Sequence, residues 1–537
     1  MSFPTVSGCS VRAMLSAGSE LALIDVRPEP IFARGHPLWA ASMPLGSLEI
    51  EAWEHLPRHE TPIVVMDDND GLANTGASRL ERIGFRNIRL LEGGLGGWIS
   101  SGGEVFTDVN VPSKAFGELV ASVCQTPSLP PEEVAGLIES GADMVVVDVR
   151  RYDEYHTMNI PGSINVPGAE LVHRIGTVAH EPSTLIVVNC AGRTRSIIGT
   201  QSLRNAAIPN RVVALRNGTI GWSLAGLELD HGRTTVAHRP ARSDQMCWAD
   251  AARTIALGTG VCFVAPCEGS SLQTPNRTAY FFDIRDTEEF ENGHPESFIP
   301  VPGGQLLQET DRFAPVRGAL LIIAGDGTAR APMTASWLAQ MGWEVVVIDD
   351  LIEWSGRRGI LRTGAYQPVR PTPPRVPTIT VDELVSVDHA TVIDVASSRD
   401  HAQGHIPGAY WEMSERLGDL VAELKVAAPI VVTSADGVAA AFAVAEIFHS
   451  DNRVRALLGG TAAWHRAGMT MEKGRDRVPE TPPDVYRRPY EGTSVEPSVM
   501  QAYLDWEYGL VEQLARDGTH GFTVWQGESQ SHPDDMN

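Results

Sequence analysis

The sequence predicts an α/β protein made of repeated domains, each with a small, mainly parallel sheet flanked by helices. Two observations support this prediction. Short β-rich apolar runs alternate with helix-like stretches along most of the 537 residues. An apolar run that ends in aspartate also occurs four times, at 22–25, 145–148, 280–283 and 391–394. Repeats this far apart indicate whole domains, because solenoid repeats are only roughly 20–50 residues long.

Each repeat continues with the same succession of elements. A second apolar strand follows the aspartate, at 62–65, 185–188, 320–323 and 429–432. A loop and a helix-like stretch come next, and each repeat later has a tryptophan: Trp98, Trp222, Trp354 and Trp464. Ligands of parallel sheets bind beyond the carboxyl ends of the strands. The loop after each second strand is therefore the expected place of a site.

Segments rich in turn-forming residues separate the repeats. The predicted linkers are 124–131, 231–243 and 368–377, and the last contains five prolines, which predicts a stiff spacer. We therefore expect domains at 1–110, 125–232, 243–365 and 376–474, followed by a C-terminal extension at 475–537.

The extension contains one predicted helix. Apolar residues recur at helical spacing from about Pro497 to Arg516, and Gly518 suits the end of a helix. We expect this helix to pack on the globular body as a strap. A lid over the active site and an oligomer contact are the alternatives, so the oligomeric state stays open.

Composition limits the partners and the compartment. A net charge of −24 excludes a broad nucleic-acid or anionic-membrane surface. No apolar run approaches the ~20 residues that span a bilayer, and the first twenty residues lack a secretory pattern. Six cysteines in so long a chain do not indicate a disulfide framework. We expect a soluble, cytoplasmic protein.

Cys190 is the candidate nucleophile. It follows the strand 184–189 and opens a loop to a helix-like stretch at 197–205. The backbone N–H groups at the helix start, the helix dipole and the nearby Arg193 and Arg195 all favour thiolate over thiol. The other repeats have no thiol at the corresponding position, which holds Asp67, Gly325 and Ser434.

These features resemble rhodanese domains, in four copies up to about residue 474. The resemblance is carried by the Asp-Val-Arg strand end, the Gly-His-Ile-Pro-Gly-Ala segment at 404–409, the cysteine loop and the later glycine-rich turn with its tryptophan. The second repeat departs from the pattern in three places. Asn159 replaces the usual histidine, the loop glycine comes one place early at Gly192, and Arg193 is an added arginine.

The resemblance implies a sulfurtransferase that needs no cofactor. A sulfane sulfur would pass from an anionic donor, thiosulfate or a persulfide, through a Cys190 persulfide to a thiol or cyanide acceptor. The loop N–H groups would hold the anionic sulfur, and the two arginines would attract an anionic donor. The expected substrate-binding residues are Ala191, Gly192, Arg193, Thr194, Arg195 and Ser196.

Three further residues are secondary candidates. Arg150 is more simply explained as the structural partner of Asp148, and Trp222 as core packing under the loop. Arg330 lies at the same place in its loop as Arg195 and suggests a non-catalytic anion site, although purely structural copies are the simpler explanation. The pair Cys262 and Cys267 lacks matching ligands, so no metal is expected.

Two other classes of protein are weighed against a sulfurtransferase. Cysteine phosphatases and arsenate reductases of related fold use a longer loop, Cys-x5-Arg, whereas Ser196 stands at that position here and arginine comes one place earlier. A non-catalytic scaffold or anion-sensing protein would treat Cys190 as incidental.

Overall fold

The computed structural model describes residues 3–241, 246, 248–265, 272, 275–349, 361–424, 429–475, 477–479 and 481–527. The chain forms two compact units. Unit 1 consists of 1–11, 22–109 and 368–487, and unit 2 of 12–21, 110–367 and 488–537. Cys190 lies in unit 2.

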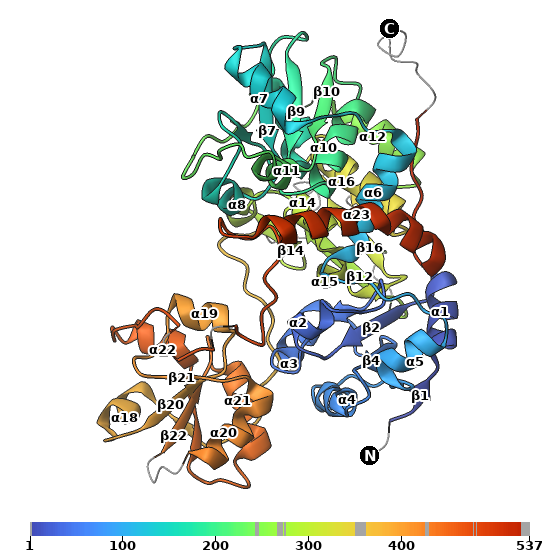
Figure 1. The fold of residues 1–537 in the computed structure, drawn as a ribbon. Coiled ribbons are helices and arrows are strands. Elements are labelled where there is room, and N and C mark those ends of the chain that lie inside the picture. The colour runs from blue at the N-terminus through green and yellow to red at the C-terminus, as the bar shows by residue number, and fades with distance from the viewer. Residues whose placement is uncertain are drawn as a thin grey trace. The chain divides into compact units, whose positions relative to one another are not determined.

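Unit 2 contains, among its described residues, two five-stranded parallel sheets with equivalent strand order (Figure 1). The second repeat has the order β6–β10–β9–β7–β8, with β6 Ser128–Leu129, β7 Met144–Asp148, β8 Ile164–Asn165, β9 Leu185–Asn189 and β10 Val212–Leu215. The third repeat has the order β11–β17–β16–β12–β14, with β11 Cys262–Val264, β12 Ala279–Asp283, β14 Ile299–Pro300, β16 Leu320–Ala324 and β17 Glu344–Ile348. The same part of the chain forms three further short strands, β13 His294–Pro295, β15 Val316–Arg317 and β18 Leu361–Arg362. Of these, β13 and β18 pair antiparallel.

Helices cover these sheets. In and before the second repeat they are α6 Val111–Cys124, α7 Pro131–Glu139, α8 Tyr152–Thr157, α9 Leu171–Arg174, α10 Thr194–Asn205 and α11 Gly218–Leu224. In the third they are α12 Ala249–Gly258, α13 Thr287–Asn292, α14 Gly303–Gln308, α15 Thr310–Phe313 and α16 Arg330–Gln340. The C-terminal helix α23, Pro497–Asp517, packs against α6 and α11 (Figure 1).

Alternate residues of β9 face two different layers of helices. Val187 packs with Val134 of α7 and Trp222 of α11 in one apolar cluster. Val188 faces α10, where a Cβ added to Gly199 would lie 3.1 Å from it. A central strand that is covered on both faces reads as a continuous apolar run, as β9 does. Cys190 therefore follows a strand that is covered by helices on both faces.

Unit 1 contains two further parallel sheets of the same kind. The first repeat has the order β1–β5–β4–β2–β3, with β1 Thr5–Val6, β2 Leu21–Asp25, β3 Ala41–Ser42, β4 Ile63–Met66 and β5 Ile88–Leu91. The fourth has the order β19–β23–β22–β20–β21, with β19 Thr378–Ile379, β20 Thr391–Asp394, β21 Tyr410–Trp411, β22 Ile430–Thr433 and β23 Val454–Leu457. The helices are α1 Gly8–Ser16, α2 Glu29–Phe32, α3 Leu48–His55, α4 Leu72–Arg82 and α5 Gly94–Ser100 in the first repeat, and α18 Val381–Ser386, α19 Ser398–Gln403, α20 Leu417–Glu423, α21 Val438–Ile447 and α22 Gly460–Arg466 in the fourth.

The predicted fold class is confirmed: four repeated domains with small parallel sheets, and a C-terminal helix that ends where Gly518 adopts a φ of 68°. Two details differ. The sequence reasoning missed α6, whose residues from Val111 to Glu118 are buried. The segment 124–131 is also more than a linker, because Ser128–Leu129 forms the edge strand β6 against β10. The linker was predicted from its turn-forming residues and the segment of α6 was left unassigned, whereas the structure of both depends on packing against the second repeat.

Candidate active site

Cys190 directly follows β9, at the carboxyl end of the second sheet. The last residue of this strand, Asn189, lies opposite Asp148 of β7 and donates an Nδ2 hydrogen bond of 2.8 Å to its carboxylate. The same carboxylate binds Arg150 through Nε and Nη2, and both Asp148 and Arg150 are almost fully buried. The side chains under the loop are therefore held by one buried ionic cluster.

The loop is also fastened to the start of α11. The backbone N–H of Thr219 donates to Cys190 O at 2.9 Å, and that of Ile220 donates to Ala191 O at 3.0 Å. Gly218 has a φ of +55°, and a Cβ there would lie 2.3 Å from Cys190 O. Glycine is required at this position because any side chain would push α11 off the loop.

The Cys190 thiol is 1% exposed. Its Sγ donates to Ser196 Oγ at 3.4 Å, and that hydroxyl donates to Arg193 O at 2.8 Å. Burial raises the pKa of the Cys190 thiol, and the opposing influence of Arg195 and of hydrogen bonding by Ser196 does not cancel it. The expectation that this loop favours the thiolate is therefore wrong, because removal of the sulfur from water outweighs the nearby charge.

Arg195 is the cation that acts on the thiol. Its guanidinium binds both carboxylate oxygens of Glu154, at 2.7 and 2.9 Å. Burial opposes this charge pair, but Arg195, with Arg150 and Arg151, lowers the pKa of Glu154 to about 2. Arg195 therefore stays charged and fixed beside Cys190.

Arg193 has a different environment from the one expected. Its Nε and Nη2 bind the carboxylate of Glu118 on α6, at 2.7 and 2.8 Å. Its Nη1 donates to Asn217 and to Tyr508, whose ring lies 4.0 Å from the guanidinium carbon. In this structure Arg193 connects the loop to α6 and α23 and is not directed at the sulfur.

Sequence reasoning missed Glu154, although the repeats contain a signal for it. Glu154 lies six residues after Asp148, and Glu289 lies six residues after Asp283. The third repeat reproduces the pair, because Arg330 binds both carboxylate oxygens of Glu289 at 2.7 and 3.0 Å. Glutamate and loop arginine thus occur together in these two repeats.

Helix α23 lies against the tip of the loop. A Cβ added to Gly192 would be 3.1 Å from Glu507 Oε2 and 3.3 Å from Tyr503 Cε1. The Tyr503 hydroxyl donates to Glu507 Oε1 at 2.9 Å. The unusual glycine of this loop therefore leaves room for two side chains of the C-terminal helix.

Lys114 of α6 is a second buried residue that the sequence did not identify. Its Nζ lies 5.5, 5.3 and 5.4 Å from the ring centroids of Tyr490, Tyr503 and Trp506. Three aromatic faces around one ammonium form a cation–π site. This contact helps to hold the C-terminal segment on α6.

The secondary candidates are all engaged within the protein. Arg150 is 1% exposed and donates to Asp148 and to Met158 O. Trp222 is 3% exposed, lies in the core cluster and donates Nε1 to Glu228 O. Trp354 and Cys267 lie outside the described residues.

Arg330 does not form an open anion site in this structure. Its guanidinium binds Asp326 and Glu289 of the third repeat and Glu170 of the second, and the side chain is 5% exposed. The buried guanidinium already binds three carboxylates, so a further anion would have to displace one of them. Arg330 thus links the second and third repeats through ion pairs.

The corresponding loop of the first repeat already holds an anion of its own. The Asp67 carboxylate accepts backbone N–H groups from Asn69 at 2.9 Å, Gly71 at 3.0 Å and Ala73 at 2.9 Å. These donors lie two, four and six residues after Asp67. In the fourth repeat the sixth N–H, that of Ala440, donates to Ser434 Oγ at 3.2 Å. The loop backbone therefore converges on the side chain at the cysteine position.

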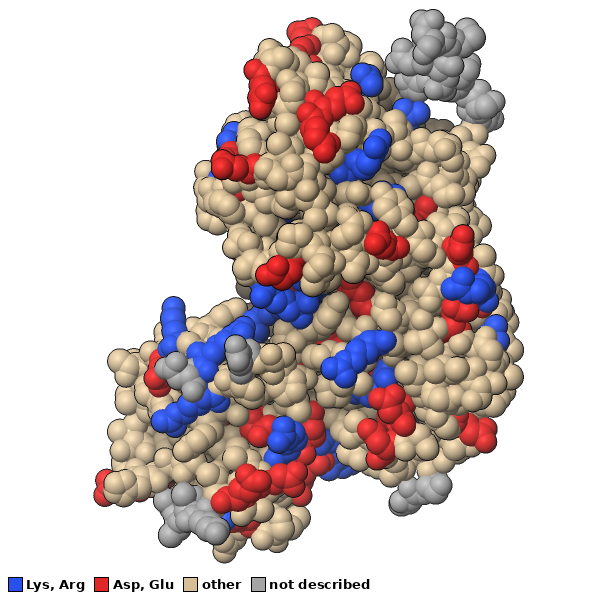
Figure 2. Space-filling model, viewed as in Figure 1, with Lys and Arg blue, Asp and Glu red and all other residues tan. Residues whose placement is uncertain are grey.

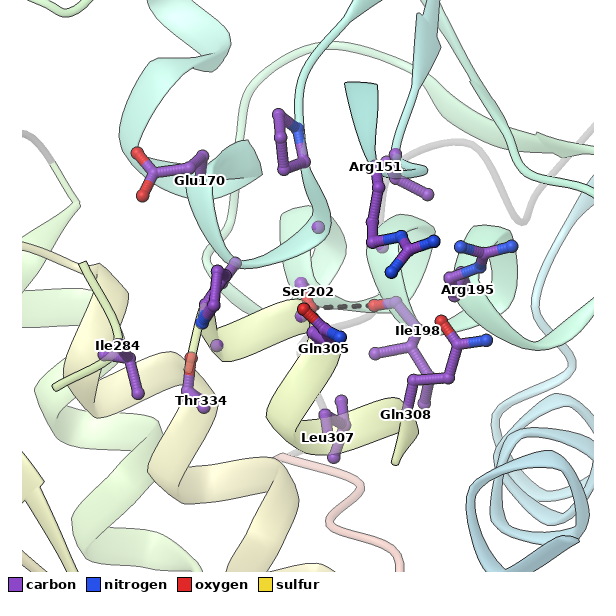
Figure 3. A pocket seen from close by; sticks show the side chains of 18 of the residues that line it. Arg151, Glu170, Arg195, Ile198, Ser202, Ile284, Gln305, Leu307, Gln308 and Thr334 are labelled. Carbon is purple, nitrogen blue, oxygen red and sulfur yellow. Dashed lines mark hydrogen bonds between the residues drawn. The ribbon is translucent and has the colours of Figure 1, made fainter. Parts of the chain in front are cut away.

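A cavity of about 540 Å³ lies beside Arg195, between the second and third repeats within unit 2. Figure 3 shows Arg151 and Arg195 on one side of it and Gln305 and Gln308 of α14 on the other. Much of the remaining wall is apolar, with Ile198, Ile284, Leu307, Met333 and Trp337 among its residues. A largely apolar space with a few converging polar groups is typical of a small-molecule site.

The surface shows charges of both signs. On the face drawn in Figure 2, acidic and basic side chains occur close together. Among the described residues, no helix combines the length and the apolar character that crossing a bilayer requires.

The comparison with protein families agrees with this fold. A model of the rhodanese-like domain matches residues 10–101, 130–225 and 380–467, which together make up just over half of the chain. The chain therefore belongs to the rhodanese family. The third repeat is outside these matches, although its sheet has the equivalent strand order.

Individual proteins give a finer comparison. A thiosulfate sulfurtransferase from Pseudomonas aeruginosa is 48% identical in sequence, with a TM-score of 0.92 over 97% of this chain and 99% of that one. A HTH-type transcriptional regulator from Mycobacterium tuberculosis is 36% identical over 91 residues, which is 17% of this chain and 39% of the regulator. The chain thus spans well under half the length of that regulator.

Proposed function

We propose that the protein is a sulfurtransferase that takes a sulfane sulfur from an anionic donor, with thiosulfate as the first candidate. The observation that carries the proposal is the Cys190 loop, in which the sulfur lies beside the fixed cation Arg195. The 48% identity to a thiosulfate sulfurtransferase supports the choice of donor.

The reaction has two steps. The Cys190 thiolate attacks the outer sulfur of thiosulfate, so that an S–S bond forms on the enzyme, the S–S bond of the donor breaks and sulfite leaves with its electron pair. Cyanide or a thiolate then attacks the terminal sulfur, which regenerates the Cys190 thiolate and releases thiocyanate or a persulfide. The thiol proton passes to solvent before the first step.

The loop backbone supports the charge of the intermediate. Asp67 in the first repeat accepts three N–H groups, and the equivalent positions around Cys190 are Gly192, Thr194 and Ser196. Donors aimed at a negative charge that develops during reaction lower the barrier. The terminal sulfur of a Cys190 persulfide would occupy the space that the longer aspartate side chain fills in the first repeat.

Intact mass spectrometry tests the proposal. After incubation with thiosulfate the protein gains about 32 Da, one sulfur on the nucleophile. The gain disappears on addition of cyanide and is absent from Cys190→Ser. A protein that gains no mass with thiosulfate or with glutathione persulfide is a scaffold or sensor, and hydrolysis of p-nitrophenyl phosphate that depends on Cys190 would identify a phosphatase.

A further inference from the structure

Glu507 is a buried carboxyl group against the candidate active-site loop. It lies in the middle of α23 and is 1% exposed. Its Oε1 accepts the Tyr503 hydroxyl, whereas its Oε2, which faces Gly192, has no hydrogen-bond partner among the described residues. A buried carboxylate oxygen without a partner is costly, so the group requires either neutrality or a ligand.

The charged groups around Glu507 come from three elements. Glu118 and Lys114 lie on α6, Arg193 and Cys190 lie on the loop, and Tyr503 lies on its own helix. Arg193 is bound through two nitrogens to Glu118, and within the part of the chain that the structure describes it forms no ion pair with Glu507. Lys114 and Arg193 are the cations that act on Glu507, but Glu507 forms no ion pair among the described residues.

The protonation state follows from this environment. Burial, followed by repulsion from Glu118, raises the pKa of Glu507 to about 8, although Lys114, Tyr503 and Arg193 act in the opposite direction. Glu507 is therefore mostly neutral at pH 7. Because Oε1 accepts from Tyr503, the acid proton belongs on Oε2, and the neutral group presents an O–H donor at the loop.

We propose that Glu507 is a positioning residue of the sulfur-transfer site, which favours an anionic donor beside Cys190 when it is neutral and disfavours it when it is a carboxylate. This inference rests on the function proposed above. As an acid, Glu507 presents an O–H donor on the side of the loop and carries no charge. As a carboxylate, it repels the donor and makes the Cys190 thiolate harder to form.

Ionisation of Glu507 is expected to slow persulfide formation from thiosulfate as the pH rises. Below pH 8 most molecules carry the neutral acid, and the site accepts thiosulfate. As the pH rises through about 8, the Glu507 carboxylate accumulates. Ionisation of the Cys190 thiol alone would increase the rate of persulfide formation with pH. In the wild type the rate therefore increases less than thiol ionisation alone predicts. Like charges in a buried site interact strongly, since the screening by water is weak there.

The experiment measures the rate of persulfide formation on the full chain by intact mass in single turnovers, from pH 6 to pH 10. Glu507→Gln keeps the shape of the side chain and cannot ionise. For a pKa of about 8, its rate relative to the wild type rises about tenfold between pH 7 and pH 9. Glu512→Gln, on an exposed position of the same helix, is the control and follows the wild type.

A second variant protects the test against misfolding. Tyr503→Phe removes the hydrogen bond to Oε1 and keeps the carboxyl group. Because that hydrogen bond lowers the pKa of Glu507, the loss of persulfide formation in this variant should occur at a higher pH than in the wild type. Identical pH profiles for wild type and Glu507→Gln would overturn the inference.

A separate measurement distinguishes this failure from failure of the proposed function. The rate of Cys190 alkylation by iodoacetamide against pH reports the thiol pKa with no sulfur donor present, and in Glu507→Gln the thiol titrates at lower pH. If no donor forms an adduct but this shift is seen, the proposed function fails and the coupling between Glu507 and Cys190 holds.

Discussion

Two loop arginines three and five residues after Cys190 have separate roles. Arg195 lies where its charge lowers the thiol pKa, and it is fixed by two hydrogen bonds to Glu154. Arg193 binds Glu118 and Tyr508 instead. Nearness in sequence did not predict this difference, because a guanidinium reaches several ångströms from its backbone and pairs with whichever carboxylate the fold brings close.

Exchange of these arginines tests the division. Arg195→Lys keeps the positive charge but cannot form the bidentate ion pair with Glu154. We expect the Cys190 thiol to titrate at higher pH and persulfide formation at pH 7 to slow by about tenfold, which corresponds to one unit of thiol pKa. Iodoacetamide alkylation against pH measures the titration. Arg193→Lys is the control and leaves the thiol titration in place; equal shifts in both variants would contradict the assignment.

At the scale of elements, helix α23 packs directly against the Cys190 loop. Gly192 accommodates Tyr503 and Glu507, and Lys114 lies among the rings of the C-terminal segment. The predicted strap is thus packed on α6 and α11 and also covers the loop. Helical periodicity located α23 correctly, but it could not identify the surface on which the helix packs.

Weakening this packing is expected to expose the thiol. Leu510 of α23 is 0% exposed, and Leu510→Ala removes buried contacts worth about 2–5 kcal/mol. Since each 1.4 kcal/mol is about tenfold in an equilibrium, iodoacetamide should alkylate Cys190 at least about tenfold faster if α23 is what covers it. Val499→Ala, at a position 46% exposed in the same helix, should react like the wild type. An unchanged rate in Leu510→Ala would mean that the loop itself shields the sulfur.

At the scale of the whole molecule, the repeats share a strand-end ion pair. Asp25 binds Arg27, Asp148 binds Arg150 and Asp283 binds Arg285, whereas His401 binds Asp394 in the fourth repeat. The aspartates are all nearly fully buried. The pair recurs because the carboxyl end of a buried strand needs its polar groups satisfied within the protein.

Loss of one partner should cost stability. Arg150→Ala leaves Asp148 buried and without its cation, which we expect to lower the free energy of unfolding by about 3–5 kcal/mol. Denaturant unfolding followed by circular dichroism measures the loss. Arg285→Ala breaks the matching pair in the third repeat, where the arginine side chain is 13% exposed, and should cost less because water can reach the remaining carboxylate. Equal losses would show that burial of the arginine does not matter.

Counting along the chain was enough to identify four repeats, the α/β class, the C-terminal helix and the position of Cys190 after a buried apolar strand. These properties are local and periodic, and the apolar pattern of each strand records them directly. Three further properties came only from the packed structure: the raised pKa of the thiol, the separate partners of Arg193 and Arg195, and the presence of Glu507 at the loop. Glu507 lies 317 residues after Cys190. Burial and charge pairing depend on which distant segments meet, and no local pattern in the sequence specifies that.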